Sequence, residues 1–490
     1  MSEETIEQQL YDEEAETFRN QLATVTDDGK RKWVYPKKPS GRFHKARIVV
    51  STILLLILFC TPFIKVNGHP FMLFDFINRK FILFGILFGP QDFHLLVIAL
   101  ISMVVFIILF TAVFGRIFCG WACPQTIFLE MVFRKIEYWI QGDSTDQRKL
   151  KAAPWTSSKF FKKFTKQIIF FAIAFIISNI FLSYIIGMDA LLKIISDPPS
   201  EHLQGLFAIT VFSGVFYFVF SNFREQACTI VCPYGRLQGV LLDRDSIVIA
   251  YDYVRGEPRR RFKKDEGWEN RGDCIECYQC VEVCPTGIDI RNGIQLECVN
   301  CTACIDACDD IMDKIKRPRG LIRYASLNLI EKPSRSSSDG KAKWRFTPRA
   351  IGYSALLTVL VSVLVILLLN RTDFSVTILR TPGLLYQEQP NNMVSNLYDL
   401  NIVNKTFDKI PVSLKLQGIE GKLKLIGNDI VIEPQGNIDA KFLILLPKNE
   451  LTKMSTPIEI GVYSKDKLIK KASTSFLAPL KKIGEDENKN

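Results

Sequence analysis

The stretch that decides the fold is CIECYQCVEVCPTGIDIRNGIQLECVNCTACIDAC, residues 274–308, which holds eight of the 13 cysteines in this 490-residue chain. Each half of the stretch has the spacing C-x2-C-x2-C-x3-C. This spacing is typical of bacterial domains with two [4Fe-4S] clusters, in which three close cysteines bind one cluster and the fourth binds the other. The predicted ligands are Cys274, Cys277, Cys280 and Cys308 for one cluster, and Cys298, Cys301, Cys304 and Cys284 for its neighbour.

A pair of zinc sites is the alternative interpretation of these cysteines, because C-x2-C units often bind zinc. Zinc sites usually take their ligands from two separated pairs, whereas this stretch has two runs of four in tandem. Pro285 follows the first run, as the ferredoxin pattern requires, but Asp309 stands where the second proline is expected. This difference changes the turn after the motif and leaves the number of ligands intact.

Four further cysteines form a second internal repeat, FGRIFCGWACPQ at 114–125 and NFREQACTIVCPYGR at 222–236. Both copies read C-x3-C-P and directly follow an apolar stretch, so the two pairs are predicted to meet across neighbouring membrane helices. In a continuous helix, residues four apart share one face. A residue before proline tends to leave the helical conformation, however, so each pair is alternatively split by a helix break. The four residues are Cys119, Cys123, Cys228 and Cys232.

Either arrangement favours reactive sulfur in this repeat. A thiol at a helix N-terminus near Arg116 or Arg224 is expected to have a lowered pKa. Thiolates select Cu(I), zinc or iron–sulfur clusters, so the four residues are candidate catalytic and metal-binding groups. The alternative is four buried structural cysteines, beside arginines that only follow the charge bias of membrane loops. Cys60 stands alone in an apolar stretch and is predicted to be a packing residue.

Five apolar stretches of about 20 residues predict a polytopic helical membrane protein. The excess of 62 Lys and Arg over 51 Asp and Glu is then explained by basic membrane loops, and nucleic-acid binding is not expected. The predicted spans are roughly 47–66, 92–114, 167–188, 204–222 and 349–370.

Loop charges predict how these spans are oriented, since Lys and Arg are enriched on the cytoplasmic side. Residues 30–47 carry eight such residues and residues 115–166 carry ten, whereas 67–91 carries two and 189–203 carries one. The N-terminus is therefore predicted to be cytoplasmic. The predicted domains begin with a cytoplasmic segment at 1–46 and four spans at 47–222, which include the first C-x3-C-P copy. A second cytoplasmic segment at 223–348 contains the second C-x3-C-P copy and the ferredoxin domain at about 265–315. A fifth span at 349–370 leads to an outer domain at 371–490.

The outer domain is predicted to be an immunoglobulin-like β-sandwich. Seven short segments there alternate apolar and polar residues and are separated by Gly, Pro, Asn and Asp. The domain contains no cysteine, so the thiols belong to the membrane and the reducing side. The acidic head at 11–16 and the tail at 484–490 are predicted to be disordered.

Two weaker patterns complete the candidate sites. Five potential copper ligands fall on the predicted outer side: His69, His94, His202, Met72 and Met188. They form either an outer copper entry site or a chance scatter of His and Met in loops near the membrane surface. The basic stretch RGEPRRRFKK at 255–264 either docks an acidic electron donor or rests on anionic lipid headgroups.

With these motifs in place, the chain resembles the CcoG family of cytochrome c oxidase accessory proteins, also called FixG or RdxA. The resemblance runs from about residue 71 to 325, and the family's five spans and outer immunoglobulin-like domain extend it to nearly the whole chain. The strings that carry it are RKFILFGILFGPQDFHLL (79–96), GRIFCGWACPQTIF (115–128), REQACTIVCPYGRLQGVLLDRDSIVIAYD (224–252), the cysteine stretch around 274–308 and RPRGLIRY (317–324).

The resemblance implies an oxidoreductase of the bacterial inner membrane that reduces Cu(II) to Cu(I) for assembly of a cbb-type oxidase. It implies the eight ferredoxin cysteines as cluster ligands and the C-x3-C-P cysteines as the copper candidates. Implied partners are oxidase subunits, copper chaperones and a cytoplasmic electron donor, and a homodimer is left open. Two alternatives remain: a quinol-linked electron relay to a periplasmic reductase, and a non-redox assembly scaffold.

Overall fold

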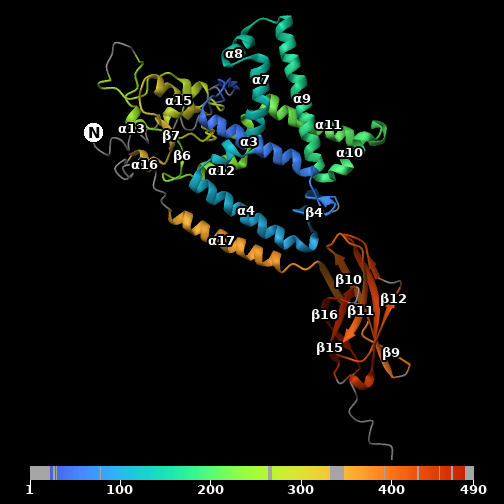
Figure 1. Cartoon of the computed structure of the whole chain (residues 1–490). Helices are drawn as coiled ribbons and strands as arrows, with labels where there is room; N and C mark the ends of the chain where they lie inside the picture. The colour runs from blue at the N-terminus through green and yellow to red at the C-terminus, as the bar shows by residue number, and fades with distance from the viewer. Residues whose placement is uncertain are drawn as a thin grey trace, which may run out of the picture. The chain divides into compact units, whose positions relative to one another are not determined.

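The structure is a computed structural model of the chain (Figure 1). It describes residues 23–25, 28, 30–77, 79–262, 268–331, 347–390, 392–427, 430–451, 453–464 and 467–479. The acidic head and the tail that were predicted to be disordered lie outside the described residues. The described chain divides into two compact units, one of residues 1–73 and 98–362 and the other of residues 74–97 and 363–490.

Among the described residues, five helices are long and apolar enough to cross a membrane, which confirms the predicted polytopic fold. Few of their side chains are buried inside the protein, as expected for helices that are apolar on all sides. Their bounds differ from the predicted ones by a few residues, except that the third begins ten residues earlier than expected. The spans are Arg42–Phe63, Phe93–Phe114, Ser157–Ile186, Pro199–Phe223 and Pro348–Leu369.

The third span shows why its start was missed. Helix α9 (Ser157–Ile186) begins with a lysine-rich turn that an apolar window excludes. The hydroxyl of Thr156 caps this start by accepting a hydrogen bond from the Lys159 amide at 3.3 Å. The helix ends at Gly187, whose φ of 86° lies in the left-handed region. Helix α9 lies beside α11 (Leu203–Phe218), as Figure 1 shows.

The first unit contains the membrane helices near both cysteine repeats and the ferredoxin segment. Buried aromatic rings join the helices, and Phe133 stacks on Phe220 with a centroid distance of 4.8 Å. The remaining helices of this unit are α3 (Arg42–Cys60), α4 (Phe93–Phe114, which begins in the second unit), α5 (Ile117–Trp121), α6 (Pro124–Ile127), a π-helical turn (Phe128–Phe133), α7 (Arg134–Gln141), α8 (Ser144–Ala152), α10 (Met188–Ser196), two further π-helical turns (Val219–Phe223 and Ala227–Val231) and α12 (Pro233–Leu241).

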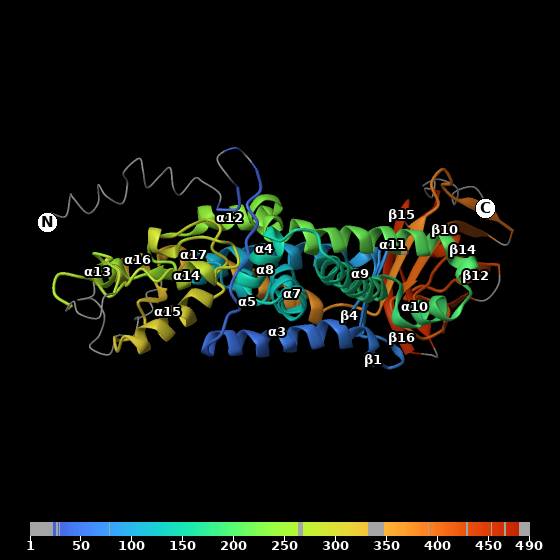
Figure 2. The same cartoon turned by 90° about the horizontal axis from the view of Figure 1, so that it is seen from above.

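The ferredoxin segment folds around one antiparallel strand pair. Strand β6 (Val248–Tyr251) pairs with β7 (Ile322–Ala325), which brings together the two ends of the cysteine-rich chain. Ile249 and Ile322, each 1% exposed, lie on this pair and pack in the same core as four of the cysteines. The helices here are α13 (Tyr253–Gly256), α14 (Gln279–Glu282), α15 (Ala303–Lys314) and α16 (Leu327–Glu331), and Figure 2 shows them gathered together.

Short strand pairs connect some of the membrane helices. They are β1 (Lys65–Val66) with β2 (His69–Pro70), and β3 (Met72–Asp75), β4 (Lys80–Leu83) and β5 (Ile86–Phe88) in one small sheet. In the second unit, the buried carboxylate of Asp92 accepts from Arg371 at 3.0 Å and from Lys405 at 2.5 Å. These ion pairs tie the 74–97 loop to the chain that enters the β-sandwich.

The second unit confirms the predicted β-sandwich. One sheet has the order β12-β14-β10-β8 with β9 beside β10, and the other has the order β13-β11-β15-β16. Tyr398 and Phe442 stack between them with 0% exposure. The predicted segments became β8 (Phe374–Arg380), β10 (Met393–Asn404), β11 (Ile410–Gln417), β12 (Lys422–Ile426), β13 (Ile430–Ile432), β14 (Asn437–Pro447) and β15 (Ser455–Ser464); β9 (Gln387–Gln389) and β16 (Lys467–Leu477) were not predicted because both are mostly polar.

Candidate metal centres

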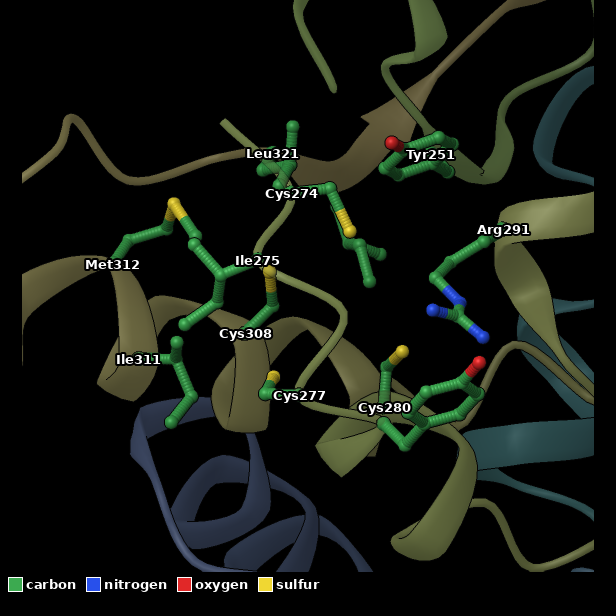
Figure 3. Close-up of a pocket in the computed structure, with 12 residues that line it drawn as sticks. Tyr251, Cys274, Ile275, Cys277, Cys280, Arg291, Cys308, Ile311, Met312 and Leu321 are labelled. Atoms are coloured by element: carbon green, nitrogen blue, oxygen red, sulfur yellow. The ribbon is translucent and has the colours of Figure 1, made fainter. Parts of the chain in front are cut away.

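The first group of ferredoxin cysteines surrounds one small cavity. Figure 3 shows Cys274, Cys277, Cys280 and Cys308 around it, with Tyr251 at one side. The other lining side chains are mostly apolar, which keeps water away from the sulfurs. The fourth cysteine thus joins the first three across about 30 residues of chain, in the grouping that the spacing predicted.

The second group lines a neighbouring cavity. Cys284 meets Cys298, Cys301 and Cys304 there, again in the predicted grouping. Cys280 borders both cavities, so the two sites share a wall. Two adjacent sites, each with four thiols in an apolar shell, match the donor set that iron–sulfur clusters take.

The backbone repeats one strained conformation at the second cysteine of each half. Glu276 and Tyr278 flank Cys277 with φ of 52° and 57°. In the second half, Asn300 and Thr302 flank Cys301 with φ of 53° and 67°. Such left-handed residues are uncommon outside glycine and concentrate at functional sites. The turns aim successive cysteines inward before α14 and α15 begin.

Burial makes these thiols costly to ionise without a metal. Desolvation raises the pKa of Cys280 and of Cys298 to about 12, and the pKa of Cys301 to about 11. A bound cationic metal supplies the charge that solvent does not, since thiolates rather than thiols are metal ligands. The residues present therefore fit two iron–sulfur clusters.

The structure explains why Asp309, and not proline, follows Cys308. Helix α15 continues through this position to Lys314, and proline in its interior would remove a helical hydrogen bond. The Asp309 carboxylate instead accepts a hydrogen bond from the Gly320 amide at 2.9 Å. It thereby fixes the turn that returns the chain to β7.

Each C-x3-C-P pair is split by a helix break, which is the second of the two predicted geometries. Cys119 lies in α5, while Cys123 is extended (φ −63°, ψ 124°) and Pro124 opens α6. In the second copy, Cys228 lies in a π-helical turn, and Cys232 is extended (φ −66°, ψ 111°) before Pro233 opens α12. The two copies therefore share one local fold.

The structure places the four thiols of this repeat near one another, although no three of them lie within 4.8 Å of one another. Cys123 and Cys232 lie close enough to Cys119 to act on its ionisation, and all three act on Cys228. Desolvation raises the pKa of Cys119 to about 11 and that of Cys228 to about 12. The predicted lowering of the pKa was wrong for these two thiols, because burial outweighs the nearby Arg116 charge.

Gln238 is a site residue that the sequence reading missed. The Cys119 thiol donates to its Oε1 at 3.3 Å, and Arg116 Nε donates to the same oxygen at 2.6 Å. Arg116 also donates to the Gly235 carbonyl at 2.7 Å, which holds α12 against the first copy. Only the position of Gln238 could have indicated this role. It lies on helix α12, which Pro233 opens, about one and a half turns after Cys232.

Arg224 does not serve the thiols as predicted. Its guanidinium binds both oxygens of Glu137, at 2.9 and 3.0 Å. Glu137 belongs to a buried ionic network in which Arg134, 1% exposed, pairs with Glu130 and with Glu225 at 3.5 Å. Arg134 also donates to the Pro285 carbonyl at 3.1 Å, so the network connects the second C-x3-C-P copy and helix α7 to the ferredoxin segment.

The thiol repeat lies directly against the second ferredoxin cavity. Cys119 packs in one buried cluster with Val299 and Cys301. Gly120 makes this approach feasible, because a Cβ there would lie 2.5 Å from the Val299 carbonyl oxygen and 2.7 Å from that of Asn300. The loop that carries the first thiol pair and the loop that carries cluster ligands are thus in backbone contact.

Other candidate residues are separate from this centre. Among the described residues, the group of three or more ligand-type side chains whose ligand atoms all lie within 4.8 Å of one another is Asp197, Glu201 and His202, with His202 Nε2 3.1 Å from Asp197; the C-x3-C-P thiols are spaced more widely. His69 and His94 are not part of that cluster. Met188, also proposed for a copper entry site, is buried in α10.

One minor prediction is corrected, and the basic stretch is described in part. Cys60 is exposed at the end of α3, so it is not packed among protein side chains as expected. In the basic stretch, Arg255 binds Asp273 at 2.5 Å and Arg259 binds Glu257 at 2.9 Å, so part of its charge stabilises the fold. Lys263 and Lys264 lie outside the described residues.

Comparisons with known proteins support an iron–sulfur protein, and one 4Fe-4S family match also covers Cys119 and Cys123 of the first C-x3-C-P copy. Family models match residues 223–327 (4Fe-4S dicluster domain), 96–143 (4Fe-4S binding domain) and 364–479 (IG-like fold at the C-terminal of FixG). RdxB and RdxA of Cereibacter sphaeroides are each 35% identical to this chain, over 77% and 79% of it and 80% and 83% of their own lengths. The nitrogen fixation protein FixG of Rhizobium meliloti is 31% identical over 86% of this chain and 87% of its own.

Proposed function

Since this chain belongs to the FixG/RdxA family and is a membrane iron–sulfur protein, we propose that it is an oxidoreductase that reduces Cu(II) to Cu(I). The cluster ligands in this proposal are the two groups of four cysteines that line the adjacent cavities. When bound, the clusters supply single electrons at low potential. One electron converts one Cu(II) to Cu(I), so copper is the substrate and the stoichiometry is one to one.

The C-x3-C-P thiols are the proposed copper site. Cu(I) prefers soft sulfur ligands, and Cys119, Cys123, Cys228 and Cys232 provide four of them. Their protons leave as copper binds, because the thiolate is the ligand form. The positive charge of Arg116 favours the thiolate of Cys119, and Gln238 orients its sulfur at 3.3 Å.

The single observation that carries this proposal is the contact at Gly120. The Gly120 backbone lies against Val299 and Asn300, the two residues between the proposed cluster ligands Cys298 and Cys301. An electron that leaves the second cavity therefore has the thiol site as its neighbour through packed protein. If the four thiols served only to pack the helices, the close contact between their loop and the loop of the cluster ligands would not be required.

Orientation and partners follow from the proposal. The basic loops at 30–47 and 115–166 put the N-terminus and both cysteine repeats on the cytoplasmic side, and the β-sandwich outside. The electron donor is then a cytoplasmic reductant. The recipient of Cu(I) is the assembly line of a cbb-type oxidase in the bacterial inner membrane, through its subunits or copper chaperones.

An anaerobic reaction tests the proposal. The reduced full-length protein receives one equivalent of Cu(II), and Cu(I) is trapped by a chromophoric chelator while cluster oxidation is followed optically. We expect the wild type and a Cys60→Ser control to yield Cu(I), and a Cys119→Ser/Cys228→Ser variant to yield little. Equal yields from all three would reject the thiol site and favour a relay or scaffold role.

A further inference from the structure

A cavity of about 630 Å³ lies beside the metal centres and has no role in the proposed reaction. Its volume is in the range of small-molecule binding sites. Its walls come from the segment before α3, the first turns of α3, the π-helical turn and α7. The residues that matter for its chemistry are Lys38, His44, Arg47, Lys135, Tyr138 and Trp139.

The charged groups of this cavity are unevenly paired. Among the described residues, no carboxylate forms an ion pair with Lys38, Arg47 or Lys135. The two acidic residues of the wall are already engaged: Glu130 pairs with Arg134, and Asp143 accepts from the Lys38 and Ser144 amides at 2.8 and 2.7 Å. The cavity thus presents three cations outside any ion pair, against one carboxylate, Asp143, that also has no cationic partner among the described residues.

Two further observations concern the polar groups of this wall. Burial, and to a smaller extent the neighbouring Lys38 charge, lower the pKa of Lys135. The Nδ1 atom of His44 is buried and has no hydrogen-bond partner among the described residues. A buried polar atom normally has a partner, but this nitrogen has almost no accessible surface, so it does not face the open volume of the cavity.

The cavity lies at the end of a membrane helix. The first candidate span begins at Arg42, and Ile48 in its second turn lines the cavity together with Met131. Trp139 on the rim is 79% exposed, and exposed tryptophan is characteristic of the membrane–water interface. A ligand with an apolar body and an anionic head would contact both the apolar wall, formed by Ile48 and Met131, and the cationic wall, formed by Lys38, Arg47 and Lys135.

We propose that this cavity binds a phosphate group, delivered by the headgroup of an anionic phospholipid. The cations that would hold the phosphate are Lys38, Lys135 and Arg47, which all line the cavity. A soluble phosphate compound has the same head chemistry but lacks the apolar body that Ile48 and Met131 would contact.

The site is linked to both kinds of metal centre. Arg47 Nε donates to the Gly120 carbonyl at 3.0 Å, in the loop of the first thiol pair. The amide of His44 donates to the Asp306 carboxylate at 2.8 Å, on the helix that carries Cys304 and Cys308. A phosphate at this position therefore contacts the residues that fix both loops, and lipid composition becomes a means of tuning them.

The test uses the full-length protein and two charge-removal variants. Lys38→Gln/Lys135→Gln empties the cavity of two cations, and Lys149→Gln/Lys162→Gln removes two exposed lysines from α8 and α9, neither of which lines the cavity. Retained phosphatidylglycerol is counted by native mass spectrometry after reconstitution and detergent extraction. Inorganic phosphate is titrated into delipidated protein in a separate arm, and the visible absorption of the clusters confirms that each variant is folded.

We expect the wild type and the α8/α9 control to retain one phosphatidylglycerol, and the cavity variant to bind it about tenfold more weakly. Saturable binding of inorganic phosphate alone, lost in the cavity variant, would keep the phosphate site but overturn its lipid source. Equal retention of both ligands by all three proteins would overturn the proposal, because the cavity cations would then have no part in anion binding.

Discussion

The ferredoxin segment and the C-x3-C-P repeat gather cysteines in different ways. The ferredoxin segment supplies all eight predicted cluster ligands from residues 274–308, and left-handed turns lie at Tyr278 and Thr302. The C-x3-C-P site takes half of its thiols from around residue 119 and half from around residue 228. The first site is encoded locally, whereas the second exists only when distant helices pack.

This difference predicts where each site is vulnerable. A locally encoded site should fail mainly through loss of its own ligands or turns. A site assembled from two helix ends should also fail through residues that hold those ends together, such as Arg134, Arg116 and Gly120. The predictions below use that contrast.

The largest expected effect is from Arg134→Ala. This buried guanidinium pairs with Glu130 and Glu225 and bonds the Pro285 carbonyl. Its loss leaves Glu130 without an ion pair among the described residues, while Glu225 keeps Arg31 and Arg224. We expect destabilisation of about 3–5 kcal/mol, seen as a collapse in the yield of folded protein. Lys314→Ala, which breaks the exposed pair with Asp310, should cost no more than about 1 kcal/mol. Equal yields would mean that the network does not hold the assembly.

Single ligand replacements should separate the two sites by iron content. Cys277→Ser removes one ligand of the first cavity and should reduce bound iron to about half, since one of two [4Fe-4S] clusters is lost. Cys123→Ser should leave iron unchanged, because that thiol is assigned to copper. Iron and acid-labile sulfide assays on purified protein give the answer. A comparable loss of iron in Cys123→Ser would reassign the C-x3-C-P thiols to a cluster.

Gly120→Ala should impair electron delivery more than cluster binding. The added Cβ would press on the Val299 and Asn300 carbonyls and force the two loops apart. We expect Cu(I) formation to slow by about tenfold or more while iron content stays near the wild-type value. Gly214→Ala is the matched control, because a Cβ there meets nothing within 4 Å. An unchanged rate in Gly120→Ala would remove the loop contact from the mechanism.

The smallest effect is expected from Asp309→Ala. It removes the acceptor for the Gly320 amide, at a cost of about 1 kcal/mol for one hydrogen bond. Cluster bleaching in a denaturant series should begin at a slightly lower concentration than in the wild type. Asp310→Ala, an exposed neighbour on the same helix, should leave the series unchanged. A shift in Asp310→Ala of the same size would point to helix charge instead of the Gly320 bond.

The sequence predicted those features of the fold that follow from hydrophobic periodicity or from the spacing of cysteines. It predicted the five membrane helices, the sandwich and the grouping of the ferredoxin cysteines, because each follows from local pattern. It did not predict β16, whose residues 467–477 include several lysines and serines and pair with β15 only through tertiary register.

The thiol site shows what local pattern leaves out. The raised pKa of Cys119 depends on burial by segments far away in the chain, and the pairing of Arg224 with Glu137 depends on how helix ends pack. Gln238 and Gly120 acquire their roles from neighbours more than 100 residues distant. Such residues carry no motif of their own, so only the folded chain identifies them.

The most direct test of the central claim is X-ray absorption at the copper edge, on reduced full-length protein given one equivalent of Cu(II) without oxygen. We predict Cu(I) with sulfur ligands alone, and loss of that signal in Cys119→Ser/Cys228→Ser while cluster iron is retained. Copper bound through nitrogen or oxygen, or a sulfur site that persists in the variant, would contradict the account.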